Sequence, residues 1–451
     1  MIALGKKRVD MLSGSIFKGI LSMMIPVMVM NVVQSIYSLI DMTVLSDYAS
    51  DSAVGAVGTC GTLISLCTGL LIGVSTGANV IVARRIGEGD KLRTQKAGET
   101  SLVFALISGT VMAVIGIVFA ELFLKWINCP ESLLKDATLY FRLYFLGVPV
   151  LMVYNFSGSL LRATGDTKRP MYFLLIGGAV KVVSNYILLA VFHRTVDGVA
   201  IATIISWLLS GALAFTAILK NEDVFCLGFK KPKMYWSELK DILYIGIPAG
   251  LQTALYSFAN TVIVKAVNTF GENATTGLSI ANQFDAILYQ ISVATSYAST
   301  PYISQNIGAK KFDRVKKIIL NSIFITCIFG ITFGSLSAIF SKELSSIMSS
   351  TPEVIDYSCQ KMIIISSTYF ICGINEVMGG TLRGMGKPIV PMISTLIFMC
   401  LIRFPWVYFV FPLYPNLTFL YLVWPIGWIL SIITLTAFYF PTMKRLKGNS
   451  L

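Results

Sequence analysis

The chain has 451 residues, of which 55% are hydrophobic and 13% are charged, and its mean hydropathy is +0.74. A soluble domain carries about 25% charged residues, so this composition excludes an ordinary soluble protein and indicates a polytopic membrane protein. The net charge of +13 would suggest a nucleic-acid partner in a soluble chain, but here the basic residues lie between apolar runs and have to be tested first as topology signals.

Apolar runs long enough to cross a bilayer as a helix, about 20 residues, occur twelve times. The predicted spans are 16–46, 53–83, 97–124, 136–160, 170–192 and 197–219 in the first half, and 239–269, 275–305, 318–341, 357–382, 388–411 and 417–441 in the second. The first run is about twice as long as a signal-peptide core and contains Asp41, so we expect it to be retained.

Basic residues are segregated by these spans. The two tails and the loops after even-numbered spans, together with Lys18 and Lys240 at the adjoining span ends, hold 27 of the 36 lysines and arginines. The opposite loops hold four, namely Lys125, Lys135, Arg194 and Lys342. Because lysine and arginine gather in cytoplasmic loops, this pattern predicts that both termini are cytoplasmic, and it accounts for the net charge without a nucleic-acid partner.

The two halves of the chain are copies of one unit. The segment Leu160–Met171 (LLRATGDTKRPM) returns as Thr381–Met392 (TLRGMGKPIVPM), with five identical residues that each recur 221 positions later. An even number of spans per copy gives both copies the same orientation, so the sequence predicts an all-α fold of two parallel six-helix bundles. The predicted domains are residues 1–220 and 239–451, joined by a cytoplasmic linker at 221–238.

The first span of each copy has a proline followed by a polar face. After Pro26, polar residues at spacings of three and four share one helical face, and after Pro248 they follow at intervals of four. Such faces avoid lipid, so we expect them to line a substrate cavity. The residues concerned are Asn31, Gln34, Ser38 and Asp41 in the first span, and Gln252, Tyr256 and Asn260 in the seventh.

Charged residues inside spans are further candidates, because a charge at the bilayer centre costs roughly 2.5 to 3.5 kcal/mol and has to face a partner or a wet cavity. The acids are Asp41, Asp285 and Glu376, with Asn282 close to Asp285. Lys181 and Arg403 lie deep in corresponding spans and are predicted to line a cavity. Arg142, Lys265 and Lys361 lie toward outer helix ends, where snorkelling or a structural ion pair explains them.

Motifs for catalysis or cofactors are lacking. RIGEGDK at 85–91 has no lysine-serine pair and no preceding strand, so it is not a phosphate loop. We find no nucleotide-binding motif and no metal-ligand cluster. The sequence predicts a secondary transporter without enzyme activity or cofactor, driven by an ion gradient.

The repeated LRxxGDTKxPM element, the RRIGEGD and QNIGAKK loops and the six-plus-six layout resemble the multidrug and toxic compound extrusion (MATE) family over essentially the whole chain. The resemblance implies an antiporter of a bacterial plasma membrane, working by alternating access of two lobes. It would export amphipathic, often cationic compounds in exchange for Na⁺ or H⁺. The partners expected are a small organic substrate and the bilayer, and the protein is expected to be monomeric.

The family's coupling-cation site maps onto Asp41, Asn185 and Thr203, where a Na⁺ would be bound if sodium is the coupling ion. One turn after Asn185, the family often has an aspartate where this chain has Leu189. Asp285 and Glu376 are therefore further candidates for coupling. Two alternatives stay open: a flippase for a lipid-linked saccharide, with Lys181, Arg142 and Arg403 in a cationic cavity, and a receptor or scaffold that transports nothing.

Overall fold

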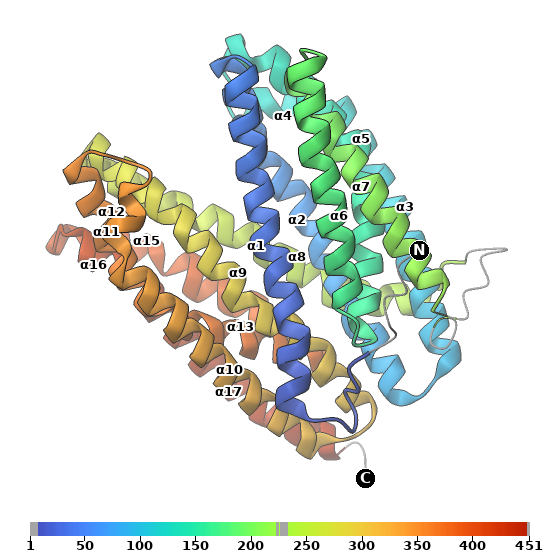
Figure 1. Cartoon of the computed structure of the whole chain (residues 1–451). Coiled ribbons are helices and arrows are strands. Elements are labelled where there is room, and N and C mark those ends of the chain that lie inside the picture. Colours follow the sequence, from blue (N-terminus) through green and yellow to red (C-terminus); the bar gives the residue numbers. More distant parts are fainter. Residues whose placement is uncertain (1–7, 222–224, 226–232, 449–451) are drawn as a thin grey trace. The chain divides into compact units, whose positions relative to one another are not determined.

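The computed structural model describes residues 8–221, 225 and 233–448, without the side chains of residues 51, 62, 256–258 and 261 (Figure 1). The described chain is helical. Its first half consists of α1 (Ile16–Tyr48), α2 (Asp51–Glu88), α3 (Lys91–Val118), α4 (Ala120–Trp126), α5 (Glu131–Ala163), α6 (Lys168–Tyr186), the π-helical η1 (Ile187–Val191) and α7 (Val196–Leu219).

The second half repeats this order. It consists of α8 (Trp236–Val267), η2 (Asn268–Phe270), α9 (Glu272–Gly308), α10 (Phe312–Ile339), α11 (Ser341–Ser346), α12 (Pro352–Ser367), α13 (Tyr369–Gly384), α14 (Ile389–Thr395), η3 (Leu396–Leu401), α15 (Arg403–Pro405), η4 (Trp406–Val410), η5 (Phe411–Leu413), α16 (Leu417–Tyr421) and α17 (Val423–Gly448). Each predicted span lies, to within one residue at its ends, inside one helix or inside consecutive helices that are separated by no more than one residue.

Among the described residues, nine helical segments are long and apolar enough to cross a membrane, and α12 and α13 together form a tenth that is bent by 47°. The helices α8 and α9, which correspond to the predicted spans 239–269 and 275–305, are not among these ten. Both carry several polar residues along their length, including Gln252, Asn260, Asn282 and Asp285.

The chain forms two compact units. The first, called the N-lobe, consists chiefly of Val29–Gly250, and the second, called the C-lobe, consists of Asp10–Met28 and Leu251–Leu451. The division falls inside α1 and α8, close to Pro26 and Pro248, so the first part of each lead helix belongs to the unit formed by the other half. The domain boundary at 221–238 stays a prediction, because most of that linker lies outside the described residues.

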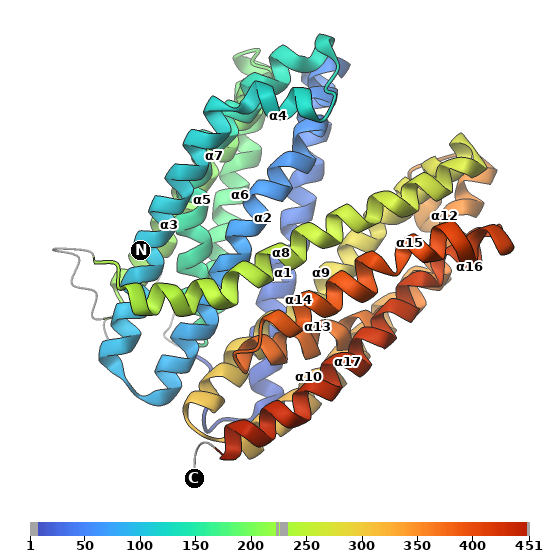
Figure 2. The same ribbon diagram turned by 180° about the vertical axis from the view of Figure 1, so that it is seen from behind.

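Helix α5 is central in the N-lobe, where it packs against α2, α3 and α7. In the C-lobe, α9 and α13 pack together, α10 lies against both, and α17 lies against α13 (Figure 2). The repeated motif has the same backbone role in both lobes. Gly165 and Gly386, 221 positions apart, have φ angles of 85° and 81° after α5 and α13, a conformation that glycine adopts without strain.

The start of α8 lies very close to α2 in the N-lobe, because glycines allow the two backbones to approach. A Cβ placed on Gly77 would lie 2.2 Å from the Ile242 carbonyl oxygen, and one on Gly73 would lie 2.2 Å from the Gly250 Cα. Small residues at helix contacts are the usual means of close packing in membranes.

We therefore expect Gly77→Ala to destabilise the protein by about 1–3 kcal/mol, the usual range for overpacking. Thermal unfolding of the purified protein measures the effect. Gly61→Ala is the matched control, because a Cβ there meets nothing within 4 Å. Equal melting temperatures for the two variants would contradict this close contact.

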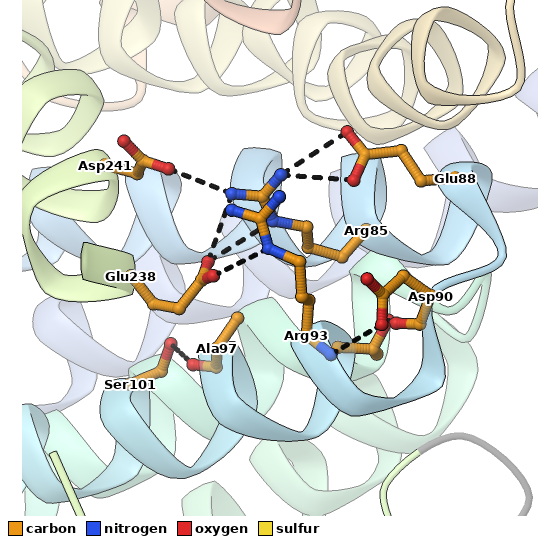
Figure 3. A network of polar contacts seen from close by, with 9 residues as sticks. Arg85, Glu88, Asp90, Arg93, Ala97, Ser101, Glu238 and Asp241 are labelled. Carbon is orange, nitrogen blue, oxygen red and sulfur yellow. Dashed lines mark hydrogen bonds and ion pairs between the residues drawn. The ribbon is translucent and has the colours of Figure 1, made fainter. Parts of the chain in front are cut away.

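Ion pairs fix the same part of α8 at the RIGEGDK motif (Figure 3). Arg85 at the end of α2 pairs with Glu88 at 3.1 Å, Glu238 at 3.3 Å and Asp241 at 2.9 Å, and Arg93 pairs with Glu238 at 3.1 Å. The rest of the motif shapes the turn. Gly89 has a φ of 74°, and Asp90 caps α3 by accepting a hydrogen bond from the Arg93 backbone N–H.

The corresponding loop of the C-lobe holds the segment before α1. Asn306 donates a hydrogen bond of 2.9 Å to the Met11 carbonyl, and Arg314 donates to the carbonyls of Met11 and Gly14. Arg93 and Arg314 are 221 positions apart. The same loop of both copies therefore holds the lead segment of the other half.

Candidate substrate and ion-binding cavities

A cavity of about 310 Å³ lies within the N-lobe, among α1, α2, α5, α6 and α7. The polar face predicted on α1 contributes three residues to its lining. The predicted site residues that line this cavity are Gln34, Ser38, Asp41, Lys181 and Thr203. Asn31, on the same predicted face, is not among the lining residues.

Asp41 is held by two side chains from α6. The Lys181 ammonium lies 2.5 Å from its Oδ2, and Asn185 donates a hydrogen bond of 2.7 Å to its Oδ1. Asn185 is fully buried, and its own Oδ1 has no hydrogen-bond partner among the described atoms. The pairing of Asp41 with Lys181 was not predicted. The available signal was the spacing of four between Lys181 and Asn185, which places both on one face of α6.

Thr203 lines the cavity from α7 but donates its hydroxyl hydrogen to the Val199 carbonyl at 2.9 Å. The Thr203 hydroxyl oxygen can still accept a hydrogen bond. Leu189, which replaces the family's aspartate, is buried in η1. Of the three residues mapped from the resemblance, the structure thus joins Asp41 to Asn185 directly and places Thr203 in the same cavity.

A second cavity, of about 380 Å³, lies within the C-lobe. It contains Lys361, which is 1% exposed and pairs with Asp285 at 2.5 Å while also donating to Asn282. Snorkelling does not describe Lys361, because its ammonium is buried in this ion pair. Arg142 and Lys265 differ: both are exposed, Arg142 donates to the Ile117 carbonyl, and Lys265 lies over the Tyr408 ring.

Arg403 is buried beside this cavity, 1% exposed. It donates a hydrogen bond of 2.6 Å to Asn260, and its guanidinium carbon lies 4.9 Å from the centre of the Trp424 ring. The Lys361 ammonium lies 5.7 Å from the same ring. Arg403 directly follows the π-helical η3 and Ile402, and the corresponding span of the N-lobe contains η1. Such π-helical turns are frequent at functional sites.

Glu376 belongs to a network next to this cavity, not to its lining. Its carboxylate lies 4.0 Å from Arg383 and accepts a hydrogen bond of 3.4 Å from Tyr289, which does line the cavity. Gln252, predicted to line a cavity, joins this network by accepting from Arg383 at 2.8 Å and donating to Thr395 at 2.8 Å. The Tyr256 side chain, predicted at the same face, lies outside the described residues.

The two cavities occupy the same place in the repeat. Of the thirteen residues that line the C-lobe cavity, eight have a counterpart 221 positions earlier that lines the N-lobe cavity, and three have one 222 positions earlier. Lys181 corresponds to Arg403, 222 positions later, but the other charged residues are not at equivalent positions. Asp285 and Lys361 correspond to Ile64 and Tyr140, and Asp41 corresponds to Ile263. The copies thus share the cavity but place its charged residues differently.

A flippase for a lipid-linked saccharide was expected to have Lys181, Arg142 and Arg403 in one cationic cavity, and the structure gives the position of each. Lys181 lies in the N-lobe cavity and is paired with Asp41, whereas Arg403 belongs to the C-lobe. Arg142 lines neither cavity. The three basic residues therefore do not lie together in one of these cavities.

Comparison with known proteins agrees with this architecture. The MatE family model matches residues 26–187 and again residues 248–409. A relative from Bacillus subtilis, "Probable multidrug resistance protein YoeA", is 26% identical, with 94% of each chain covered. The "FAD transporter" of Shewanella oneidensis is 24% identical, with 89% of each chain covered. A solved structure described as an outward-facing multidrug resistance MATE family transporter of the MOP superfamily superposes with a TM-score of 0.91, at 20% identity, covering 98% of this chain and 99% of that one.

Proposed function

Because this chain belongs to the MATE family of multi-pass multidrug efflux transporters, which carry small molecules and are not enzymes, we propose that it exports amphipathic cations by secondary antiport. The N-lobe cavity would bind the substrate, and Asp41 would couple its release to entry of an external cation. The observation that carries this proposal is the contact of 2.5 Å between Asp41 and Lys181 in that cavity.

The coupling follows from competition for one carboxylate. Among the described lining residues of the N-lobe cavity, Asp41 is the only acid, so a cationic substrate gains its charge interaction there. The Lys181 ammonium can occupy the carboxylate when the substrate is absent, and a proton on Asp41 removes the charge that binds the substrate. A substrate cation and a proton cannot both use the carboxylate, which is the requirement for exchange.

Of the two coupling ions considered, we propose the proton. A sodium ion needs several oxygen ligands, for which Asp41, Asn185 and Thr203 would be available. It would, however, bind next to the Lys181 ammonium, and two like charges 4 Å apart repel by about 4 kcal/mol at an effective dielectric constant of 20. A proton needs only one carboxylate oxygen and removes the charge instead of adding to it.

The cellular setting proposed is a bacterial plasma membrane, with a monomer whose termini are both cytoplasmic. Bacterial relatives and the distribution of lysine and arginine support it. Alternating access of the two lobes would carry the substrate across.

Efflux of ethidium from proteoliposomes tests the proposal. With an imposed pH gradient, a Na⁺ gradient or neither, we expect the wild type to respond to the pH gradient. Asp41→Asn should lose this gradient-driven efflux at least about tenfold, a change of 1.4 kcal/mol. Asp47→Asn, an exposed acid further along α1, is the matched control and should behave as the wild type.

Full gradient-driven efflux by Asp41→Asn would show that coupling does not depend on the N-lobe carboxylate. A wild type that responds only to Na⁺ would leave the antiport standing and overturn the choice of proton. Absence of efflux under every gradient, with folded protein, would overturn the antiport itself.

A further inference from the structure

The C-lobe cavity has no part in the exchange proposed above, although it has the features of a binding site. It matches the N-lobe cavity position by position, yet its charged residues are placed differently. Lys361 is the only cation and Asp285 the only acid among the described residues that line it. Arg403 is buried beside the cavity, in contact with Asn260 and Trp424, which do line it. The N-lobe cavity has one cation and one acid, Lys181 and Asp41. The two linings thus carry the same charges, and the C-lobe cavity differs by the additional buried arginine beside it.

Two polar atoms at this cavity lack hydrogen-bond partners among the described residues. They are Oδ1 of Asp285 and Nε1 of Trp428, both buried and both on residues that line the cavity. An unsatisfied buried donor or acceptor costs free energy, and such groups usually find a partner in a ligand or water. The cavity can thus offer a ligand one acceptor and one donor, in addition to the cations.

The remaining lining is aromatic. Tyr289, Tyr369, Trp424 and Trp428 form much of the wall, and Trp424 lies within cation–π distance of both Lys361 and Arg403. Flat aromatic walls favour a flat aromatic ligand. An acidic group on that ligand would be bound well by an arginine, whose guanidinium can donate two parallel hydrogen bonds to a carboxylate.

We propose that the C-lobe cavity is a binding site for aromatic organic anions, separate from the cation site of the N-lobe. The acidic group pairs with Arg403 and Lys361, the aromatic body lies against Trp424 and Trp428, and the indole N–H of Trp428 donates to the ligand. This site does not depend on proton exchange at Asp41.

Two dyes with the same xanthene core and opposite charges test the proposal: fluorescein, an anion, and rhodamine 6G, a cation. Fluorescence anisotropy with the purified full-length protein gives their affinities. We expect saturable fluorescein binding by the wild type, weakened about tenfold in Arg403→Gln, while rhodamine 6G binding is unchanged. Asp41→Asn should show the opposite pattern, losing rhodamine 6G and keeping fluorescein.

If Arg403→Gln does not fold, it will lose the binding of both dyes. Two further variants keep the proposal testable in that case. Trp428→Phe keeps an aromatic ring and removes only the unpaired N–H, so fluorescein binding should weaken severalfold. Lys361→Leu combined with Asp285→Leu removes the ion pair without leaving a single charge buried, and should also weaken it. The proposal is overturned if the wild type does not bind fluorescein, if these variants keep its affinity within about twofold, or if Asp41→Asn abolishes fluorescein binding.

Discussion

Replacing Lys181 by methionine is expected to raise the affinity of the protein for tetraphenylphosphonium by about tenfold, or 1.4 kcal/mol. In the wild type, the ammonium of Lys181 contacts the Asp41 carboxylate at 2.5 Å and so competes with any bound organic cation. Methionine has similar length and no charge, so the competitor is removed and the cavity is kept. Equilibrium binding of radiolabelled tetraphenylphosphonium to the purified protein measures the change.

The same variant should also export more slowly, because a substrate that the carboxylate binds more tightly is released less readily. Lys181→Arg is the matched control: it keeps the positive charge and should stay close to the wild type in affinity. If methionine and arginine at this position give the same affinity, Lys181 is not a competitor for Asp41, and the exchange proposed for the N-lobe loses its mechanism.

The helical spans could be predicted because each one is an apolar run between charged loops, a pattern that can be recognised from the local sequence alone. The repeat also pointed to two glycines whose backbone conformation is special. Gly165 and Gly386 were recognised only as identical residues 221 positions apart, and the structure shows why both are glycine: each has a positive φ where a helix ends.

The partner of each buried acid could not be predicted in the same way. Lys181 lies 140 positions after Asp41, and Lys361 lies 76 positions after Asp285, so each contact depends on how two helices are rotated about their axes. Distance from a helix end left snorkelling and a structural ion pair open for Lys361, and the structure gives its ammonium a buried ion-pair partner in the C-lobe cavity. Glu376 was a coupling candidate by its depth in the span and by the resemblance, and its contact with Arg383 was not predicted.

The exchange of lead segments could not be predicted either. Pro26 and Pro248 were recognised in the two lead helices, but a proline gives no information about which unit the preceding turns join. That assignment depends on contacts distant in sequence, such as Gly77 with Ile242 in the N-lobe and Thr295 with Met24 in the C-lobe. The loops RIGEGDK and QNIGAKK were identified only as a repeated pair, and their ion pairs and hydrogen bonds hold these segments.

Glu238→Gln is expected to destabilise the protein by about 3 kcal/mol, the lower end of the range for breaking a buried ion pair. Glu238 is 2% exposed and is the one carboxylate seen to pair with both Arg85 and Arg93. Glutamine keeps the shape and one acceptor oxygen but leaves the two guanidinium groups without that charge. Arg85 retains Glu88 and Asp241, which is why we expect the lower end of the range.

Thermal unfolding of the purified protein measures this loss, and Asp313→Asn is its control. Asp313 pairs with Lys447 at 3.0 Å but its side chain is 95% exposed, so its removal should cost less than about 1 kcal/mol. In a double-mutant cycle, Arg93→Gln should cost much less when Glu238 is already glutamine, because the two side chains lose one shared interaction. Additive losses would mean that Arg93 and Glu238 do not act together in holding the start of α8, and that Arg85 and the glycine contacts hold it without Arg93.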